Sequence, residues 1–274
     1  MDYVDDLQRV VSLPAVPRRI VSLVPSITET LFVLGAGTRV VGVTEYCTHP
    51  PEGVAAITKV GGTKNPRLDV IVRLNPDLVI LNEEENRRED FQWLEAQGLT
   101  LYVTAPRTVA DGIRLIDTLG EVLGCQGASA RITRGLRTLY HRVTAETAGR
   151  PRLRVFCPVW RKPWMAFNRD TYADDMLWRC GGENVLRGRA DRYFTVTLEE
   201  VAALAPQVVL LPSEPYPFAP KHFVHLRPLA DTPAGRAGHF YCVDGMGLCW
   251  YGPRIADGLA QLSRLFAYVR GTVE

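Results

Sequence analysis

Two stretches of the chain repeat one another 130 residues apart (68 against 198), and this repeat constrains the fold most strongly. LDVIVRLNPDLVIL at 68–81 aligns with LEEVAALAPQVVLL at 198–211. In each copy, apolar residues spaced three or four apart predict an amphipathic helix, a proline ends that helix, and the following apolar run predicts a buried strand. The aligned pairs are Leu68 and Leu198, Ile71 and Val201, Leu74 and Leu204, Pro76 and Pro206, Val79 and Val209, and Leu81 and Leu211. The repeat therefore predicts two α/β lobes of the same construction.

The stretch from residue 19 to residue 51 has the pattern of a βαβ unit. Ile20 to Val24 predicts a buried strand, and Ser26 with Glu29 has the capping-box spacing of a helix start. A second buried strand, Val40 to Thr44, leads into a loop with Tyr46, Cys47 and His49. In such units ligands bind beyond the carboxyl ends of the strands, so we expect this loop to lie at a binding site.

The order of the remaining segments predicts the domain organisation. Strands and helices alternate up to about residue 105, two helices follow, and the alternation restarts near residue 153. The second of these helices, at 1.5 Å per residue, is about 30 Å long and could join two lobes. We predict an N-terminal extension at 1–18, an α/β lobe at 19–125, a linking helix at 126–150 and a second α/β lobe at 151–274. The fold class is two Rossmann-like lobes joined by one long helix.

Composition excludes several classes of protein. The 274 residues are 46% hydrophobic and 23% charged, which is ordinary for a globular protein. The net charge is +2 and no block of basic residues occurs, so we expect no nucleic-acid partner. No apolar run reaches the roughly 20 residues that span a bilayer, so the chain is not expected to be membrane-embedded. We expect a monomer that is cytoplasmic as the sequence stands, or periplasmic or extracellular if a leader was removed.

The loops that follow the strands of both lobes are expected to face a cleft between the lobes. They are rich in aromatic residues, which suits a large flat or apolar ligand held by contact area and stacking. We predict that Trp160, Trp164 and Trp250 line this cleft. The candidate ligand-binding residues are Ser26, Tyr46, Cys47, His49, Thr63, Lys64, Glu84, Asn86, Arg107, Trp160, Arg161, Trp164, Glu214, Tyr216, Phe218, Trp250 and Arg254.

The same loops contain candidate residues for a metal site and for a catalytic site. Cys47, His49 and Glu84 offer a thiolate, an imidazole and a carboxylate, a donor set that suits zinc or iron. The alternative function is therefore a cytosolic metal-ion or small-molecule sensor that uses Cys47, His49 and the acidic loop Glu83–Glu85. An enzyme is not expected. Cys47 and His49 lie only two residues apart, Ser26 lacks the glycines of a nucleophile elbow, and no phosphate-binding glycine motif occurs.

Five segments carry a resemblance to a known family: residues 19–51, the LDVIVRLNPDLVI stretch at 68–80, GGENV at 181–185, LEEVAALAPQVVLL at 198–211 and GPRIADGL at 252–259. The chain resembles the periplasmic binding proteins of iron-siderophore, haem and cobalamin importers, without their leader, and is most similar to the cobalamin-binding members. The resemblance implies two lobes joined by a long helix, which allows only limited closure. It also implies a metal chelate as ligand, a corrinoid before haem or a ferric siderophore, with no separate cofactor.

The resemblance also carries roles for particular residues. Tyr46 matches a tyrosine that packs against the corrin ring in the cobalamin-binding members, whereas a tryptophan of their next loop is replaced near Thr63. An ABC importer permease is the implied partner. By position, Asp69 and Glu199 match the acid on each lobe that meets arginines of the permease.

Overall fold

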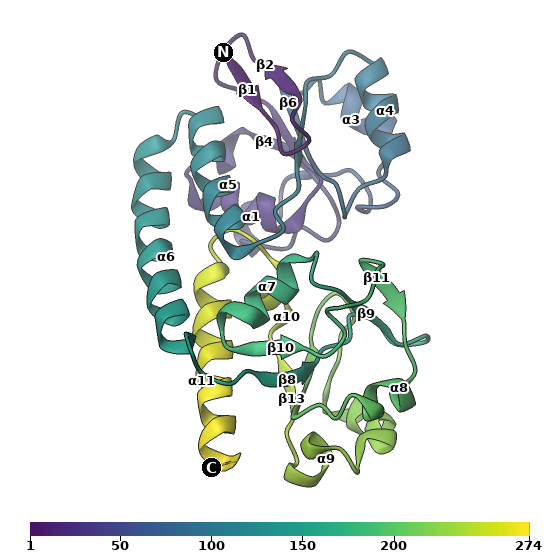
Figure 1. Ribbon diagram of the computed structural model, residues 1–274. Coiled ribbons are helices and arrows are strands. Elements are labelled where there is room, and N and C mark those ends of the chain that lie inside the picture. The colour runs from purple at the N-terminus through teal and green to yellow at the C-terminus, as the bar shows by residue number, and fades with distance from the viewer. Residues whose placement is uncertain (274) are drawn as a thin grey trace. The chain divides into compact units, whose positions relative to one another are not determined.

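The computed structural model describes residues 1–273 and divides into two compact α/β units (Figure 1). Unit 1 comprises residues 1–106, 110–135 and 251–253. Unit 2 comprises residues 107–109, 136–250 and the segment that begins at residue 254. The long helix α6 (Gln126–Thr147) contributes to both units, because their boundary falls within it.

Unit 1 is built on a five-stranded parallel sheet with the strand order β5-β4-β3-β6-β7. Its elements are β1 (Asp2–Val4), β2 (Val10–Ser12), β3 (Ile20–Ser22), α1 (Pro25–Val33), η1 (Gly37–Arg39), β4 (Val40–Val43), α2 (Pro51–Val54), β5 (Thr58–Lys59), α3 (Leu68–Arg73), β6 (Leu78–Asn82), α4 (Arg88–Ala96), β7 (Leu101–Thr104) and α5 (Val109–Val122). Strands β3, β6 and β7 are buried at every residue, as their unbroken apolar runs predict for a parallel sheet covered on both faces.

Unit 2 is built on a four-stranded parallel sheet with the order β10-β8-β12-β13. A two-stranded antiparallel pair, β9 with β11, lies outside that sheet. The elements are β8 (Leu153–Phe156), β9 (Met165–Phe167), α7 (Tyr172–Arg179), β10 (Gly182–Asn184), β11 (Tyr193–Thr195), α8 (Leu198–Ala203), β12 (Val208–Pro212), η2 (Pro220–Leu229), α9 (Pro233–Ala237), β13 (Phe240–Val243), α10 (Gly245–Cys249) and α11 (Ile255–Val273).

The structure confirms the repeat read from the sequence. Helix α3 and strand β6 in unit 1 correspond to α8 and β12 in unit 2, each shifted by 130 residues. Ile71 and its counterpart Val201 are both completely buried, in the cores of their own units. The turns between helix and strand also match, since Asn75 has a φ of 44° and Ala205 a φ of 45°.

An arginine caps the end of the repeated helix in both units. Arg19, just before β3, donates from its Nη2 to the carbonyl oxygen of Leu74 at 2.6 Å. Arg154, in β8, donates from its Nη2 to the carbonyl oxygen of Leu204 at 2.5 Å. Because the last carbonyls of a helix have no partner within the helix, these guanidinium groups satisfy them in the same way in each unit.

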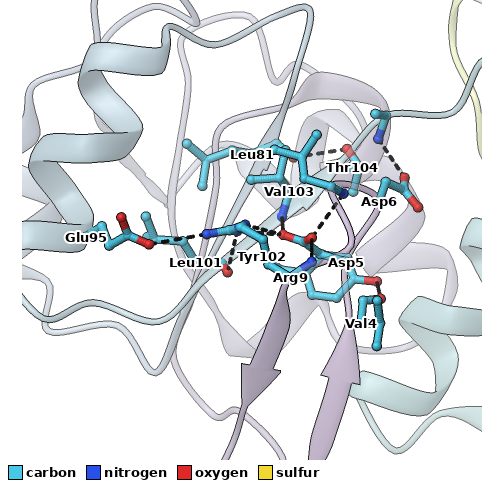
Figure 2. A network of polar contacts seen from close by, with 12 residues as sticks. Val4, Asp5, Asp6, Arg9, Leu81, Glu95, Leu101, Tyr102, Val103 and Thr104 are labelled. Atoms are coloured by element: carbon cyan, nitrogen blue, oxygen red, sulfur yellow. Dashed lines mark hydrogen bonds and ion pairs between the residues drawn. The ribbon is translucent and has the colours of Figure 1, made fainter.

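The first residues form a hairpin fastened to unit 1, where an extension was expected. The side chain of Asp5 is fully buried and accepts hydrogen bonds from the backbone amides of Leu7 and Arg9, each at 3.0 Å, and of Val103 at 3.2 Å (Figure 2). The Arg9 guanidinium forms an ion pair with the same carboxylate at 2.5 Å. The amide of Asp6 donates to the carbonyl oxygen of Val103 at 3.1 Å, so the hairpin turn covers part of the exposed edge of β7.

The expected capping box at Ser26 is not formed. Helix α1 begins at Pro25, its N-cap is Val24, and no side chain caps it. Proline is favoured in the first turn of a helix because it lacks an N–H and its φ is preset. Ser26 therefore lies inside the first turn, with a buried side chain. Within residues 1–273 no helix is both long and apolar enough to cross a membrane.

Candidate ligand-binding site

In each parallel sheet, later strands are added first on one side of the first strand and then on the other, which creates a topological switch point. In unit 1 the first strand, β3, lies between β4 and β6, and in unit 2 the first strand, β8, lies between β10 and β12. At such switch points the loops after neighbouring strands diverge, which leaves a natural binding crevice at the carboxyl ends. In unit 2 these loops are residues 157–164 and 213–219; in unit 1 they follow β3 and β6.

The two loops of unit 2 form a connected set of aromatic rings. Trp160 meets Tyr216 edge to face, with ring centroids 5.3 Å apart, and Tyr216 lies 4.6 Å from Phe218. Trp164 stacks on Phe218 at 5.8 Å with the planes 6° apart. Phe218 belongs to the core of unit 2, with Trp164 and Tyr216 packed against it, whereas Trp160 remains 42% exposed. The result is an aromatic surface anchored at one end in the core and open at the other.

The backbone also restrains the exposed ring. The amide of Met165 donates to the carbonyl oxygen of Trp160 at 3.1 Å, and the amide of Val159 donates to that of Met165 at 2.9 Å. This bridge closes residues 160–165 into a short loop ahead of β9. A large ring held on a restrained backbone loses little conformational entropy when a ligand stacks on it.

Basic groups border the aromatic surface. The Arg161 guanidinium contacts Nε2 of His225 in η2 at 2.7 Å. Nδ1 of His222 accepts a hydrogen bond from the backbone amide of Ala219 at 2.9 Å. Desolvation lowers the pKa of His222 and of His225, and the positive charge of Arg161 lowers both further. The sequence prediction missed both histidines, although their spacing of three directly after the aromatic loop was a readable signal.

In unit 1 a buried tyrosine interacts with the segments that follow β3 and β6. Tyr251 is buried, and its hydroxyl contacts Oε1 of Glu85 at 3.2 Å. Burial, followed by the nearby charge of Glu85, raises the pKa of Tyr251 well above its usual range. Gly252 has a φ of 115°, and a Cβ there would meet Oγ1 of Thr30 at 2.3 Å, so only glycine fits this close approach to α1. Ser26, whose side chain is also buried here, offers no exposed contact.

Two asparagines shape the acidic loop after β6. The Asn82 side-chain oxygen accepts from the amides of Glu84 at 2.8 Å and Glu85 at 3.1 Å. The Asn86 side-chain oxygen accepts from the amide of Asn82 at 2.8 Å, and its amide nitrogen donates to the carbonyl oxygen of Thr63 at 3.0 Å. Asn86 and the Thr63 backbone therefore join loops to one another, a structural role that was not predicted.

The expected three-ligand metal site is not formed. Cys47 is completely buried, and its sulfur lies 3.1 Å from the hydroxyls of both Thr28 and Thr44. Burial raises the pKa of this thiol, which opposes the thiolate that a metal would need. Nδ1 of His49 lies instead 3.1 Å from the hydroxyl of the neighbouring Thr48. In the described part of the chain, no group of three or more His, Cys, Asp or Glu side chains could hold a metal ion.

The remaining candidates are scattered. Tyr46 is 61% exposed and stays available to a ligand, whereas Trp250 is only 6% exposed and is not an open stacking surface. Arg107 forms an ion pair with Asp170 at 2.9 Å. Lys64 donates to the Glu84 carbonyl oxygen at 2.6 Å, Arg254 lies 3.9 Å from Asp257, and Glu214 is partly buried in the aromatic loop. The structure therefore gathers the candidates into two sets. Thr63, Lys64, Glu84 and Asn86 join loops of unit 1 to one another, whereas Trp160, Trp164, Tyr216 and Phe218 form the aromatic surface of unit 2, with Arg161 and Glu214 in the same loops.

This architecture, two α/β units that each contain a parallel sheet and share one long helix, defines a class of substrate-binding protein. The chain belongs to the periplasmic binding protein family, which it matches over residues 20–245. It has the class III fold of that family.

One relative and two solved structures show the degree of similarity. The vitamin B12-binding protein of Vibrio vulnificus (strain CMCP6) is 27% identical over 261 residues, 94% of either chain. The structure of the periplasmic heme-binding protein RhuT from Roseiflexus sp. RS-1 aligns with a TM-score of 0.79 at 27% identity, covering 92% of this chain and 98% of RhuT. The vitamin B12-binding protein BtuF of Vibrio cholerae aligns with a TM-score of 0.82 over 94% of this chain and 99% of BtuF; at 20% identity that likeness is one of fold.

Proposed function

We propose that the chain is a non-enzymatic binding protein for a flat metal chelate, with a corrinoid favoured over haem or a ferric siderophore. The observation that carries this proposal is the aromatic surface of unit 2, in which Trp160 is exposed while Tyr216, Trp164 and Phe218 hold its surroundings against the core. A flat macrocycle offers the apolar area that such a surface needs. The relatives support the class of ligand, since one is named for vitamin B12 and another for heme.

Burial and stacking alone suffice for this function. Apolar contact contributes about 25 cal/mol for each Å² removed from water, so a macrocycle that covers a few hundred Å² is held firmly without any covalent step. Tyr46, exposed on unit 1, is a second proposed contact. A receptor of this kind passes its ligand to the permease of an importer, which requires it to act outside the cytoplasmic membrane; fractionation of the source cells tests that location.

The test is a binding titration followed by tryptophan fluorescence, with cobalamin, haem and a ferric siderophore as probes. We expect quenching and saturation with at least one probe. Trp160→Ala is expected to weaken binding by roughly tenfold or more, since stacking on one aromatic ring contributes about 1–3 kcal/mol.

The chain offers a matched control for this variant. Trp93, in α4 of unit 1, is 41% exposed against 42% for Trp160 and lies outside the proposed site. Trp93→Ala should therefore leave the affinity unchanged. Absence of binding by all three probes would overturn the chelate proposal, and equal losses in the two variants would remove Trp160 from the site.

A further inference from the structure

The basic residues beside Trp160 come from two segments that meet at one contact. Arg161 and Lys162 follow Trp160 in the loop after β8, and Lys221 and His225 lie in η2, after the loop that follows β12. The Arg161 Nη2 to His225 Nε2 distance of 2.7 Å joins the segments across 64 positions of sequence. Arg161 is partly buried, and the contact holds its guanidinium against η2, whose His222 ring lies 5.5 Å from the ring of Tyr216 in the aromatic surface.

The contact also determines the protonation state of His225. A guanidinium group can only donate hydrogen bonds, so Nε2 of His225 must be the acceptor and carries no proton. The His225 ring is therefore neutral and does not compensate the charge of Arg161. His222 accepts at Nδ1 from the Ala219 amide, so it is neutral in the same way.

Among the described residues, these positive charges are not paired with carboxylates. Within residues 1–273, none of Arg161, Lys162 and Lys221 forms an ion pair, and the remaining N–H groups of Arg161 have no protein acceptor. Arg107 in the same unit shows the contrast, because it forms an ion pair with Asp170 at 2.9 Å. An oriented arginine without a counter-charge, beside an open aromatic ring, is suited to a ligand that brings both a flat face and an anionic group.

We propose that Arg161, positioned by His225, binds a free carboxylate on the rim of the chelate whose face lies on Trp160. This inference rests on the proposed function and narrows the substrate class to macrocycles with free acid side chains, as opposed to those whose rim is fully amidated or esterified. The lowered pKa of His225 agrees with it, because a neutral ring keeps its acceptor at Nε2 for Arg161. Lys162 and Lys221 add positive potential around the same rim.

The test compares macrocycles that differ only in the charge of the rim. Ferric protoporphyrin is titrated against its dimethyl ester, and cobyrinic acid against its heptamethyl ester, so that each pair shares one ring and one metal. Wild-type protein is expected to bind the free acid of at least one pair roughly tenfold to a hundredfold more tightly than the ester, the range for a hydrogen bond between charged groups. In Arg161→Gln this preference should disappear, with the affinity for the ester unchanged.

Three further variants distinguish direct contact, positioning by His225 and overall charge. Arg227→Gln removes one positive charge from the exposed face of η2 and should retain the acid preference of the wild type. His225→Gln keeps an acceptor for Arg161 and should retain most of the preference, whereas His225→Phe should lose most of it.

The inference would be overturned if the wild type bound acid and ester equally, or if Arg161→Gln weakened the binding of acid and ester by the same factor. Either result would leave the chelate proposal standing. If none of the four macrocycles binds, the carboxylate inference is overturned. If cobalamin and a ferric siderophore also fail to bind, the proposed function fails as well.

Discussion

At the scale of single residues, burial decides which side chains can meet a ligand. Tyr46 and Cys47 are neighbours, yet one is 61% exposed and the other completely buried. Burial also changes the chemistry of the buried group, as the raised pKa of the Cys47 thiol shows. Burial also raises the pKa of Asp174 in α7, although Nη2 of Arg187 lies 3.4 Å from its Oδ2.

The raised pKa of Asp174 predicts how this residue's contribution to stability depends on pH. Its pKa in the folded protein lies above the unfolded value of about 3.8, chiefly because burial penalises the charged form. The folded state therefore binds the proton more tightly, so this group's contribution to stability falls as pH rises from 3.8 through the folded pKa. We expect Asp174→Asn to be at least as stable as the wild type at pH 7, with the advantage gone below about pH 4. Urea unfolding across this pH range measures it.

The neighbouring acid provides the control. Asp175 accepts from the Val109 amide at 2.8 Å and from Nε of Arg179 at 3.0 Å. Asp175→Asn weakens both bonds and should cost about 1–3 kcal/mol at pH 7. A large loss of stability at pH 7 in Asp174→Asn would show that its ion pair with Arg187 outweighs the cost of burial.

At the scale of elements, the repeated helix, turn and strand show which details the architecture demands. Both copies place a residue with positive φ between helix and strand, and both cap the helix with an arginine. The residue in that turn differs, however: Asn75 in unit 1 and Ala205 in unit 2. Asparagine tolerates the left-handed region far better than alanine, so the same turn carries more strain in unit 2.

This difference predicts that substitution by glycine changes the stability of the fold differently at the two positions. Ala205→Gly removes strain that exceeds the entropy gained by the unfolded chain, so we expect a stabilisation of about 0.5–1 kcal/mol. Asn75→Gly should change stability little or reduce it slightly. Chemical denaturation of both variants measures this, and a destabilised Ala205→Gly protein would contradict the strain in that turn.

At the scale of the whole molecule, the repeat places one exposed acid at the same position of each unit. Asp69 and Glu199 are the second residues of α3 and α8, and both are exposed. We propose that they are the acids that dock on a permease. Their settings differ, because Asp69 forms an ion pair with Arg73 at 2.6 Å whereas Glu199 forms none among the described residues. A permease arginine would have to compete with Arg73 for Asp69.

Charge reversal tests this docking. Asp69→Lys with Glu199→Lys should abolish stimulation of the importer's ATPase while leaving chelate affinity unchanged, because like charges across an interface cost several kcal/mol. Of the single variants, Glu199→Lys should have the larger effect. Glu89→Lys, an exposed acid in the first turn of α4, is the control and should be silent. Full stimulation by the double variant would exclude these acids from the interface.

The sequence by itself determined the main alternation of helices and strands, the two α/β units and their repeat, because periodicity and proline breaks are local signals. It also pointed to the aromatic loops of unit 2, which follow neighbouring strands. Only the tertiary structure showed that Tyr251 is buried against Glu85, that Cys47 and Trp250 are buried, and that His225 contacts Arg161. The Arg161–His225 and Glu85–Tyr251 contacts join residues 64 and 166 positions apart. No local pattern encodes such contacts, since packing and sheet order decide which loops meet and which side chains remain open to a ligand.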